Sequence, residues 1–297
     1  MMIGEILKVG NLVGNMLLNK VGDLMKNFLK IIFSVILAFS LCSCNCSVFE
    51  YRTFGVWWWD DTLDSGKYFE FAKDNGVNEI YYCSDDFDEN TSQFIEKAKK
   101  ENIKVYFLAG EYEWLSDSSN LYNKINAYVS YQKKFSNKFS GIHLDIEPHQ
   151  NPEFDNNREE LISNLIKLAN SLKNKYPDIT FDYDLPFWLN DEISFNGQNK
   201  EAYKHMIDVA DRVFLMSYRD SADAIYEVSK DEIEYAQSVD KVLVLGLETK
   251  SNEGDKVSFQ EEGKGYMYSE IINLWKLVPS GFGVTIHHIK SWYDLSE

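Results

Sequence analysis

The feature that most constrains the fold is a regular alternation of short β-rich runs with helical stretches. Between the runs, apolar residues recur at three- and four-residue spacing, as in 92–102 and 158–176, which is typical of amphipathic helices. This alternation predicts an α/β fold, a single (β/α)8 TIM barrel with eight parallel strands. The predicted strands are 54–59, 78–83, 104–109, 141–147, 179–184, 212–218, 241–247 and 281–287.

An open, doubly wound sheet would give the same alternation. Such a sheet usually carries a Gly-rich phosphate-binding loop after its first strand, and the sequence has no loop of that kind. We therefore expect one barrel domain over residues 53–297. The net charge of −17 argues against a nucleic-acid partner, because nucleic acids are bound by basic surfaces.

The segment ahead of the predicted barrel has the pattern of an export signal. Lys26 and Lys30 precede the apolar run 31–41, which is shorter than the roughly 18 residues that a membrane span needs. The ending Leu-Cys-Ser-Cys resembles a lipobox, which implies a lipid on Cys44 and anchoring at the outer face of the cell membrane. The expected parts are an over-called extension at 1–24, a lipoprotein signal peptide at 25–43 and a short tether at 44–52.

The stretch GIHLDIEPH carries ionisable groups at alternate positions of a predicted strand, namely His143, Asp145 and Glu147. On a strand they share one face, and turning them into a fold costs several kcal/mol unless they are paired or used. Barrels place their chemistry at the C-terminal ends of the strands. The candidate catalytic residues at those ends are Glu147, Asp145, Tyr218, Asp184 and Glu248. The candidate substrate-binding residues are Trp58, Trp59, Asp60, Glu111, Trp188, Arg219, His288 and Trp292.

Carboxylates beside aromatic side chains suit a carbohydrate partner, because sugar rings pack their C–H faces on Trp and offer hydroxyls to acceptors. Glycosidic bonds are cleaved by one carboxylic acid that protonates the leaving oxygen, aided by a second group. Glu147 is the candidate acid, Asp145 the neighbour that tunes or orients it, and Tyr218 the residue that positions the sugar. This chemistry needs no cofactor and no metal. The sequence does not indicate the oligomeric state.

Two motifs give a family resemblance. The segment from Ser140 to Glu147 resembles the strand-four signature of chitinase-type glycoside hydrolases, D-G-x-D-x-D-x-E, and 214–218 resembles their strand-six M-x-Y element. The resemblance implies that Glu147 is the general acid, that Asp145 orients a substrate N-acetyl group as internal nucleophile, and that Tyr218 hydrogen-bonds this group. The departures are Ser140 and His143 for the first two Asp residues, and His287-His288 where the family usually ends strand eight with Trp.

Glu147-Pro148 is also similar to the Asn-Glu-Pro motif of the large retaining barrel clan, with Ile146 in place of Asn. That clan's nucleophile ends strand seven, where this chain has Glu248. Retaining enzymes hold their two carboxyl groups roughly 5 Å apart, and a wider gap implies inversion. The sequence leaves the route open.

Two other function classes fit the same residues. A metal-dependent hydrolase could use His143, Asp145, Glu147, His287 and His288, since His and carboxylates are ordinary ligands, although their spacing matches no recognised ligand motif. A catalytically silent barrel could bind glycans without cleaving them. His143 is equally compatible with a hydrogen-bonded interior residue that orients Asp145.

Overall fold

The computed structural model describes residues 52–60, 65–84, 86–251 and 253–297. The predicted extension and signal peptide, Cys44 and the tether up to residue 51 lie outside the described residues. Within the described ranges, none of the helices is long and apolar enough to cross a membrane.

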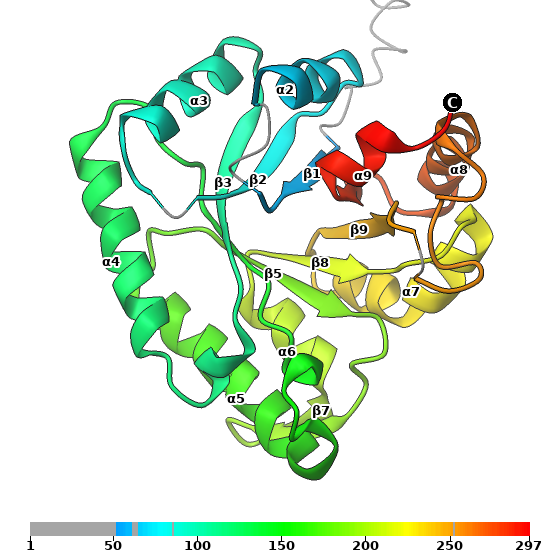
Figure 1. Ribbon diagram of the computed structural model, residues 1–297. Coiled ribbons are helices and arrows are strands. Elements are labelled where there is room, and N and C mark those ends of the chain that lie inside the picture. The colour runs from blue at the N-terminus through cyan, green and yellow to red at the C-terminus, as the bar shows by residue number, and fades with distance from the viewer. Residues whose placement is uncertain (1–51, 61–64, 85, 252) are drawn as a thin grey trace, which may run out of the picture. The chain divides into compact units, whose positions relative to one another are not determined.

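Eight parallel strands close into a barrel, as the sequence predicts (Figure 1). Around the barrel the order is β1-β2-β3-β4-β5-β8-β9-β10, and β10 pairs with β1. The strands are β1 (Phe54–Trp58), β2 (Glu79–Cys83), β3 (Lys104–Ala109), β4 (Ile142–Leu144), β5 (Phe181–Pro186), β8 (Arg212–Met216), β9 (Leu243–Glu248) and β10 (Gly283–His287).

Helices cover the outside of the barrel (Figure 1). They are α2 (Ser65–Asp74), α3 (Glu89–Lys100), α4 (Ser119–Lys134), α5 (Phe154–Lys175), α6 (Ala202–Val209), α7 (Ala222–Ser238), α8 (Lys264–Leu277) and α9 (Ile289–Asp294), with 3-10 turns η1 (Tyr112–Leu115) and η2 (Pro148–Gln150). Sequence reasoning missed an antiparallel hairpin after β5, formed by β6 (Glu192–Phe195) and β7 (Gln198–Glu201). Its turn is Asn196-Gly197, both at positive φ, a common hairpin signal.

The pleat of β1 sends its aromatic residues in opposite directions. Trp58 faces outward, is fully buried, and packs edge-to-face on Tyr68 of α2 and Phe94 of α3 at 6.1 and 5.4 Å between ring centroids. The prediction that Trp58 stacks on a sugar is therefore wrong, because helices cover it. Trp57 faces the barrel interior instead, where it joins an apolar cluster with Tyr81 and Phe214.

Trp292 is also not at the rim. It lies on α9, is fully buried, and packs against Phe54 and Phe71 at 5.8 and 4.9 Å between ring centroids. The short α9 thus packs a Trp into the space between the barrel and the outer helices, and the prediction that Trp292 binds sugar is wrong.

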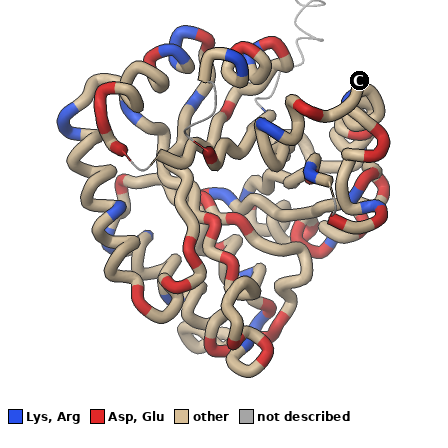
Figure 2. Tube along the Cα trace, in the orientation of Figure 1, with Lys and Arg blue, Asp and Glu red and all other residues tan. Residues whose placement is uncertain are grey.

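A charged cluster closes the N-terminal end of the barrel interior. Arg212 lies 2.8 Å from Glu79 and 2.6 Å from Asp182, and the hydroxyl of Tyr81 donates to Glu79 at 2.7 Å. Figure 2 shows acidic positions along the central strands as well as on the outer helices. Because this cluster and the aromatic layer above it fill the barrel, the opposite, C-terminal end is the one available for a site.

Candidate active site

Asp145 and Glu147 follow the end of β4 and lie at the mouth of the barrel. The backbone N–H of Asp145 still donates to Ala109 at 3.0 Å, which extends the pairing with β3 beyond Leu144. A Cβ on Gly110 would lie 1.9 Å from the backbone oxygen of Asp145, so glycine is what permits this close approach. Pro148 then begins η2 at a position where its missing N–H is not needed, and Glu147 is left at the edge.

Glu147 is held by two residues of the turn that follows it. One carboxylate oxygen, Oε2, lies 2.9 Å from Nε2 of His149, and Oε1 accepts from the side-chain amide of Gln150. The side chain retains 14% of its exposure. Glu147 is therefore oriented by neighbours but remains accessible from the mouth.

A buried pair of His143 and Asp184 lies beneath Asp145. Nε2 of His143 is 2.7 Å from Oδ2 of Asp184, and Nε1–H of Trp57 lies 3.1 and 3.2 Å from these two atoms. Burial lowers the pKa of His143 to about 3. Burial and the charge of Glu147 raise the pKa of Asp184 well above its usual range. Both pKa shifts favour a neutral pair over an ion pair. In the neutral pair, protonated Asp184 donates to Nε2 of His143.

Trp57 is one of the site residues that sequence reasoning missed, as are Gln150 and Lys250 at the mouth. Strand alternation in Trp57-Trp58-Trp59 places the first and third on one face, and that signal was available. The structure uses Trp57 as the donor between His143 and Asp184, and it places Trp59 at the mouth.

Asp145 faces the mouth with an unused oxygen. Burial raises the pKa of its carboxyl well above the usual range, and the nearby charges of Asp184 and Glu147 add to this effect. Oδ1 of Asp145 is buried and has no hydrogen-bond partner among the described residues. A protonated carboxyl with a free oxygen at a cavity can accept from, or donate to, a bound ligand.

Glu248, at the end of β9, is only 2% exposed and both of its oxygens are engaged. Oε1 accepts the backbone N–H groups of Thr249 and Lys250, both at 2.7 Å, and Oε2 lies 2.8 Å from Nδ1 of His287. Burial alone would raise the pKa of Glu248, but His287 and the two N–H groups lower it overall. Glu248 is therefore a carboxylate that is hydrogen-bonded to Nδ1 of His287.

The ring of Tyr218 stacks on His287, with centroids 5.9 Å apart and planes at 20°. Burial and the charge of Glu248 raise the pKa of the Tyr218 phenol well above its usual range. The phenol therefore stays protonated and can donate a hydrogen bond at the mouth.

Two adjoining cavities occupy the mouth and share Asp145, Glu147, Gln150, Lys250 and His287. The first, of about 390 Å³, is also lined by Trp188, Tyr218, Arg219 and Glu248. The second, of about 440 Å³, is also lined by Trp59, Glu111 and His288. Most of the residues predicted for the site are thus brought together. Asp60 lines neither cavity, and its backbone oxygen accepts from Nε1–H of Trp58 at 2.9 Å.

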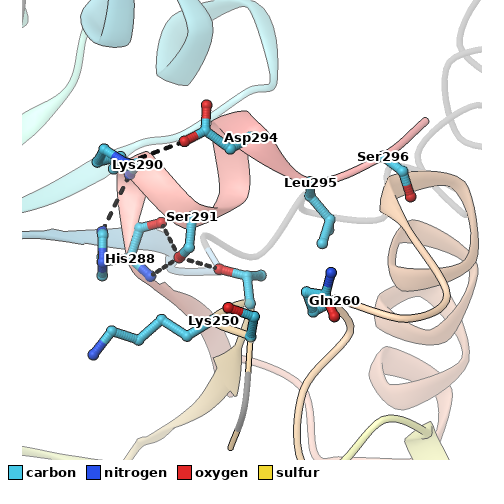
Figure 3. Close-up of a pocket in the computed structure, with 10 residues that line it drawn as sticks. Lys250, Gln260, His288, Lys290, Ser291, Asp294, Leu295 and Ser296 are labelled. Atoms are coloured by element: carbon cyan, nitrogen blue, oxygen red, sulfur yellow. Dashed lines mark hydrogen bonds and ion pairs between the residues drawn. The ribbon is translucent and has the colours of Figure 1, made fainter.

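A third pocket of about 460 Å³ adjoins the second and shares Lys250 and His288 with the mouth (Figure 3). Its other side is formed by α9, including Lys290 and Asp294. Nδ1 of His288 accepts the backbone N–H of Lys290 at 3.2 Å, and Ser291 caps the same turn. His288 therefore caps α9 as well as lining the mouth, and burial, together with neighbouring His287, lowers its pKa to about 4.

The described residues do not form a metal centre: no group of three or more His, Cys, Asp and Glu side chains among them is arranged to hold an ion. His143 is engaged with Asp184 in the interior, whereas His287 is engaged with Glu248 at the mouth. Two residues of the metal-dependent alternative, His143 and His287, are thus each engaged with a different carboxyl group.

No protein-family model matches the chain, and no curated protein matches it by sequence. Solved structures resemble it in fold. A GH18 chitinase from Pseudoalteromonas aurantia is 13% identical with a TM-score of 0.54, covering 81% of this chain and 95% of that one. A variant of the class V chitinase from Nicotiana tobaccum, in complex with NAG4, is 13% identical with a TM-score of 0.52 over 81% and 95% of the two chains. The spore cortex-lytic enzyme of Bacillus cereus is 13% identical with a TM-score of 0.51, over 82% and 73%.

The chain is therefore structurally similar to GH18 chitinases and related glycoside hydrolase barrels. At such low identity the likeness shows the fold alone. The case for an activity has to come from the residues at the mouth.

Proposed function

We propose that the protein is a glycoside hydrolase that cleaves a polysaccharide, with Glu147 as the general acid. One observation carries this proposal: Glu147 lines two adjoining cavities together with Asp145, a carboxyl group that has an unused oxygen. Glycosidic hydrolysis requires a carboxylic acid with a second functional group at the same opening.

The ends of the cavities support a carbohydrate substrate. Trp188 lines one cavity and Trp59 the other, with the carboxyl pair shared between them. Aromatic rings on both sides of the carboxyl pair would let sugar units stack on each side of the bond to be cleaved. Tyr218, Arg219 and Glu111 supply hydrogen-bonding groups to the hydroxyls, and the tobacco chitinase of the same fold was solved with a bound chitin oligomer.

The experiment is reducing-end release by residues 47–297 on chitin, peptidoglycan, and α- and β-glucans. We expect Glu147→Gln to reduce release at least about 100-fold, which is the typical contribution of a general acid, because the amide cannot protonate the leaving oxygen. Glu160→Gln, at an exposed position of α5, is the matched control and should leave the rate unchanged.

Release that survives Glu147→Gln would contradict the assignment of the acid. If neither protein releases sugar but both retain glycans in a pull-down, the barrel is a binding module rather than a hydrolase.

We also propose that the protein is exported and anchored to the outer face of the membrane by a lipid on Cys44. The sequence pattern at 25–44 is the support for this location. Cell fractionation should find the wild-type chain with the membrane and Cys44→Ser released from it. Cys83→Ser, which changes the cysteine at the end of β2, is the control and should remain with the membrane.

A further inference from the structure

We propose that His287, oriented by Glu248, is the general base that activates the attacking water, so that the sugar is released with inverted configuration. This inference rests on the proposed glycoside hydrolase function. It adds a catalytic residue and selects one of the three routes that the sequence leaves open.

The first step concerns Glu248, which the sequence offers as a retaining nucleophile. Its Oε1 accepts two backbone N–H groups and its Oε2 accepts from Nδ1 of His287. A carboxylate that is 2% exposed and bonded at both oxygens is held in place rather than presented to an anomeric carbon. The geometry assigns Glu248 a positioning role.

The second step concerns the ring that Glu248 holds. Nδ1 of His287 is hydrogen-bonded to Oε2 over 2.8 Å, which leaves Nε2 as the ring nitrogen that the proposal assigns to the water. The ring is also fixed by its stacking on Tyr218, and the side chain lines both cavities at the mouth. An imidazole whose Nδ1 is held by a carboxylate and whose ring lines the cavity has the arrangement of a general base.

The other titratable groups at the mouth are worse bases. Burial and adjacent carboxylates raise the pKa of Asp145, which favours its protonated form, and Asp184 lies beneath it, engaged with His143. Lys250 is a cation that lines the same cavities. Of the shared lining residues other than the proposed acid, His287 is thus the one suited to accept a proton.

The positions of the two groups suit a single displacement. Glu147 follows β4 and His287 ends β10, and three strands separate β4 from β10 in either direction around the closed barrel. The two side chains therefore approach the cavities from opposite sides. Inverting enzymes need a gap of roughly 6.5–9.5 Å between acid and base to hold the water.

The step balances without a cofactor. Nε2 of His287 takes a proton from water as the water oxygen bonds to the anomeric carbon. The bond from that carbon to the leaving oxygen breaks, and Glu147 gives its proton to that oxygen. The net reaction is hydrolysis, and the proton on His287 returns to Glu147 through solvent.

Two readouts test the assignment. The first is the configuration of the initial product from the polysaccharide that the screen identifies, followed by ¹H NMR. We expect this configuration to be opposite to that of the cleaved bond.

The second uses α- and β-fluorides of glucose and N-acetylglucosamine, because fluoride leaves without acid assistance. We expect Glu147→Gln to keep fluoride hydrolysis within about tenfold, and His287→Ala and His287→Gln to lose at least about 100-fold on both substrates.

The positioning role of Glu248 has its own readout. ¹⁵N NMR of the histidine-labelled protein should show His287 protonated at Nδ1 in the wild type and not in Glu248→Gln, and that variant should lose kcat with little change in KM. The thermal midpoint of each variant establishes that it is folded.

The outcomes separate this inference from the proposed function. Glu147-dependent hydrolysis with retained configuration, or full activity of folded His287→Gln, would overturn the role of His287 and leave the glycosidase proposal standing. Absence of hydrolysis on every polysaccharide and fluoride overturns both.

Discussion

At the scale of single residues, the site holds carboxyl groups whose charged form is disfavoured by their surroundings. Burial and neighbouring negative charge raise the pKa of Asp145 and of Asp184 in the folded state. A raised folded pKa means that the folded chain binds protons more tightly than the unfolded chain. The stabilisation that these two groups give the folded state is complete at pH values below the ordinary carboxyl pKa of about 4. It is lost as the pH rises through the folded-state pKa.

Asp145→Asn should therefore raise the thermal midpoint at pH 7.5, because the amide is neutral at every pH. The gain should shrink towards pH 4.5, because the pH then approaches the ordinary carboxyl pKa of the unfolded chain and the difference in proton binding between the two states becomes small. For a domain of this size each kcal/mol shifts the midpoint by roughly 2–4 °C. Thermal unfolding of both proteins at the two pH values is the measurement, with the exposed Asp178→Asn as control. A shift of equal size at both pH values would contradict the account.

At the scale of elements, two Trp residues at similar distances from strand ends have opposite roles. Trp188 follows β5 and is half-buried at the mouth, packed against His149 with ring centroids 5.2 Å apart and covered by Arg158 at 5.1 Å. Trp58 lies inside β1 under α2 and α3. Trp188, beyond the end of its strand, reaches the rim, whereas Trp58, an outward residue within its strand, is covered by helices.

This difference predicts two distinct defects. Trp188→Ala should raise KM for the polysaccharide about tenfold, the equivalent of 1.4 kcal/mol of lost binding, and leave the midpoint of urea unfolding nearly unchanged. Trp58→Ala should cost about 3–5 kcal/mol of stability, as large core truncations do. Steady-state kinetics and urea titrations of both variants are the measurements. Comparable destabilisation of the two would contradict the assignment of Trp188 to the mouth.

The strand–helix alternation was sufficient to predict all eight barrel strands, because parallel strands buried on both faces leave a strong apolar signal. What the pattern could not fix was the position of each strand end relative to the mouth. β4 is predicted to reach Glu147 but pairs as a strand only over Ile142–Leu144, since Pro148 begins a 3-10 turn. Trp292 was placed at the rim by its position after β10, but the short α9 carries it back into the core.

The parts of the site that could be predicted are those that a single strand carries. His143, Asp145 and Glu147 follow from alternation along one segment. The pairs that join strands, His143 with Asp184 and Glu248 with His287, depend on the registers of β4 with β5 and of β9 with β10. Those registers are set by the closure of the barrel and are not visible in any local pattern.

At the scale of the whole molecule, the two ends of the barrel differ. The N-terminal end is closed by the charged cluster of Arg212, Glu79 and Asp182, called the floor below, and the C-terminal end is the open, acidic mouth. The floor joins three strands through Arg212, which contacts both Glu79 of β2 and Asp182 of β5. Both carboxyl groups are fully buried. A buried carboxylate without a partner costs several kcal/mol. Substitutions in the floor therefore test how the barrel is stabilised without touching the mouth.

Arg212→Met should destabilise the protein at pH 7.5 by about 3–5 kcal/mol, since it removes the guanidinium from two buried carboxylates. Adding Glu79→Gln and Asp182→Asn to the same chain should recover most of that loss, because no buried carboxylate is then left without the guanidinium. The loss caused by Arg212→Met alone should shrink at pH 4.5: burial raises the pKa of Asp182 even with Arg212 present, and without the guanidinium this carboxyl protonates more readily. Urea unfolding of the three proteins at both pH values is the measurement. An equal loss in the single and triple variants would mean that the side chain of Arg212 stabilises the barrel by packing rather than by charge.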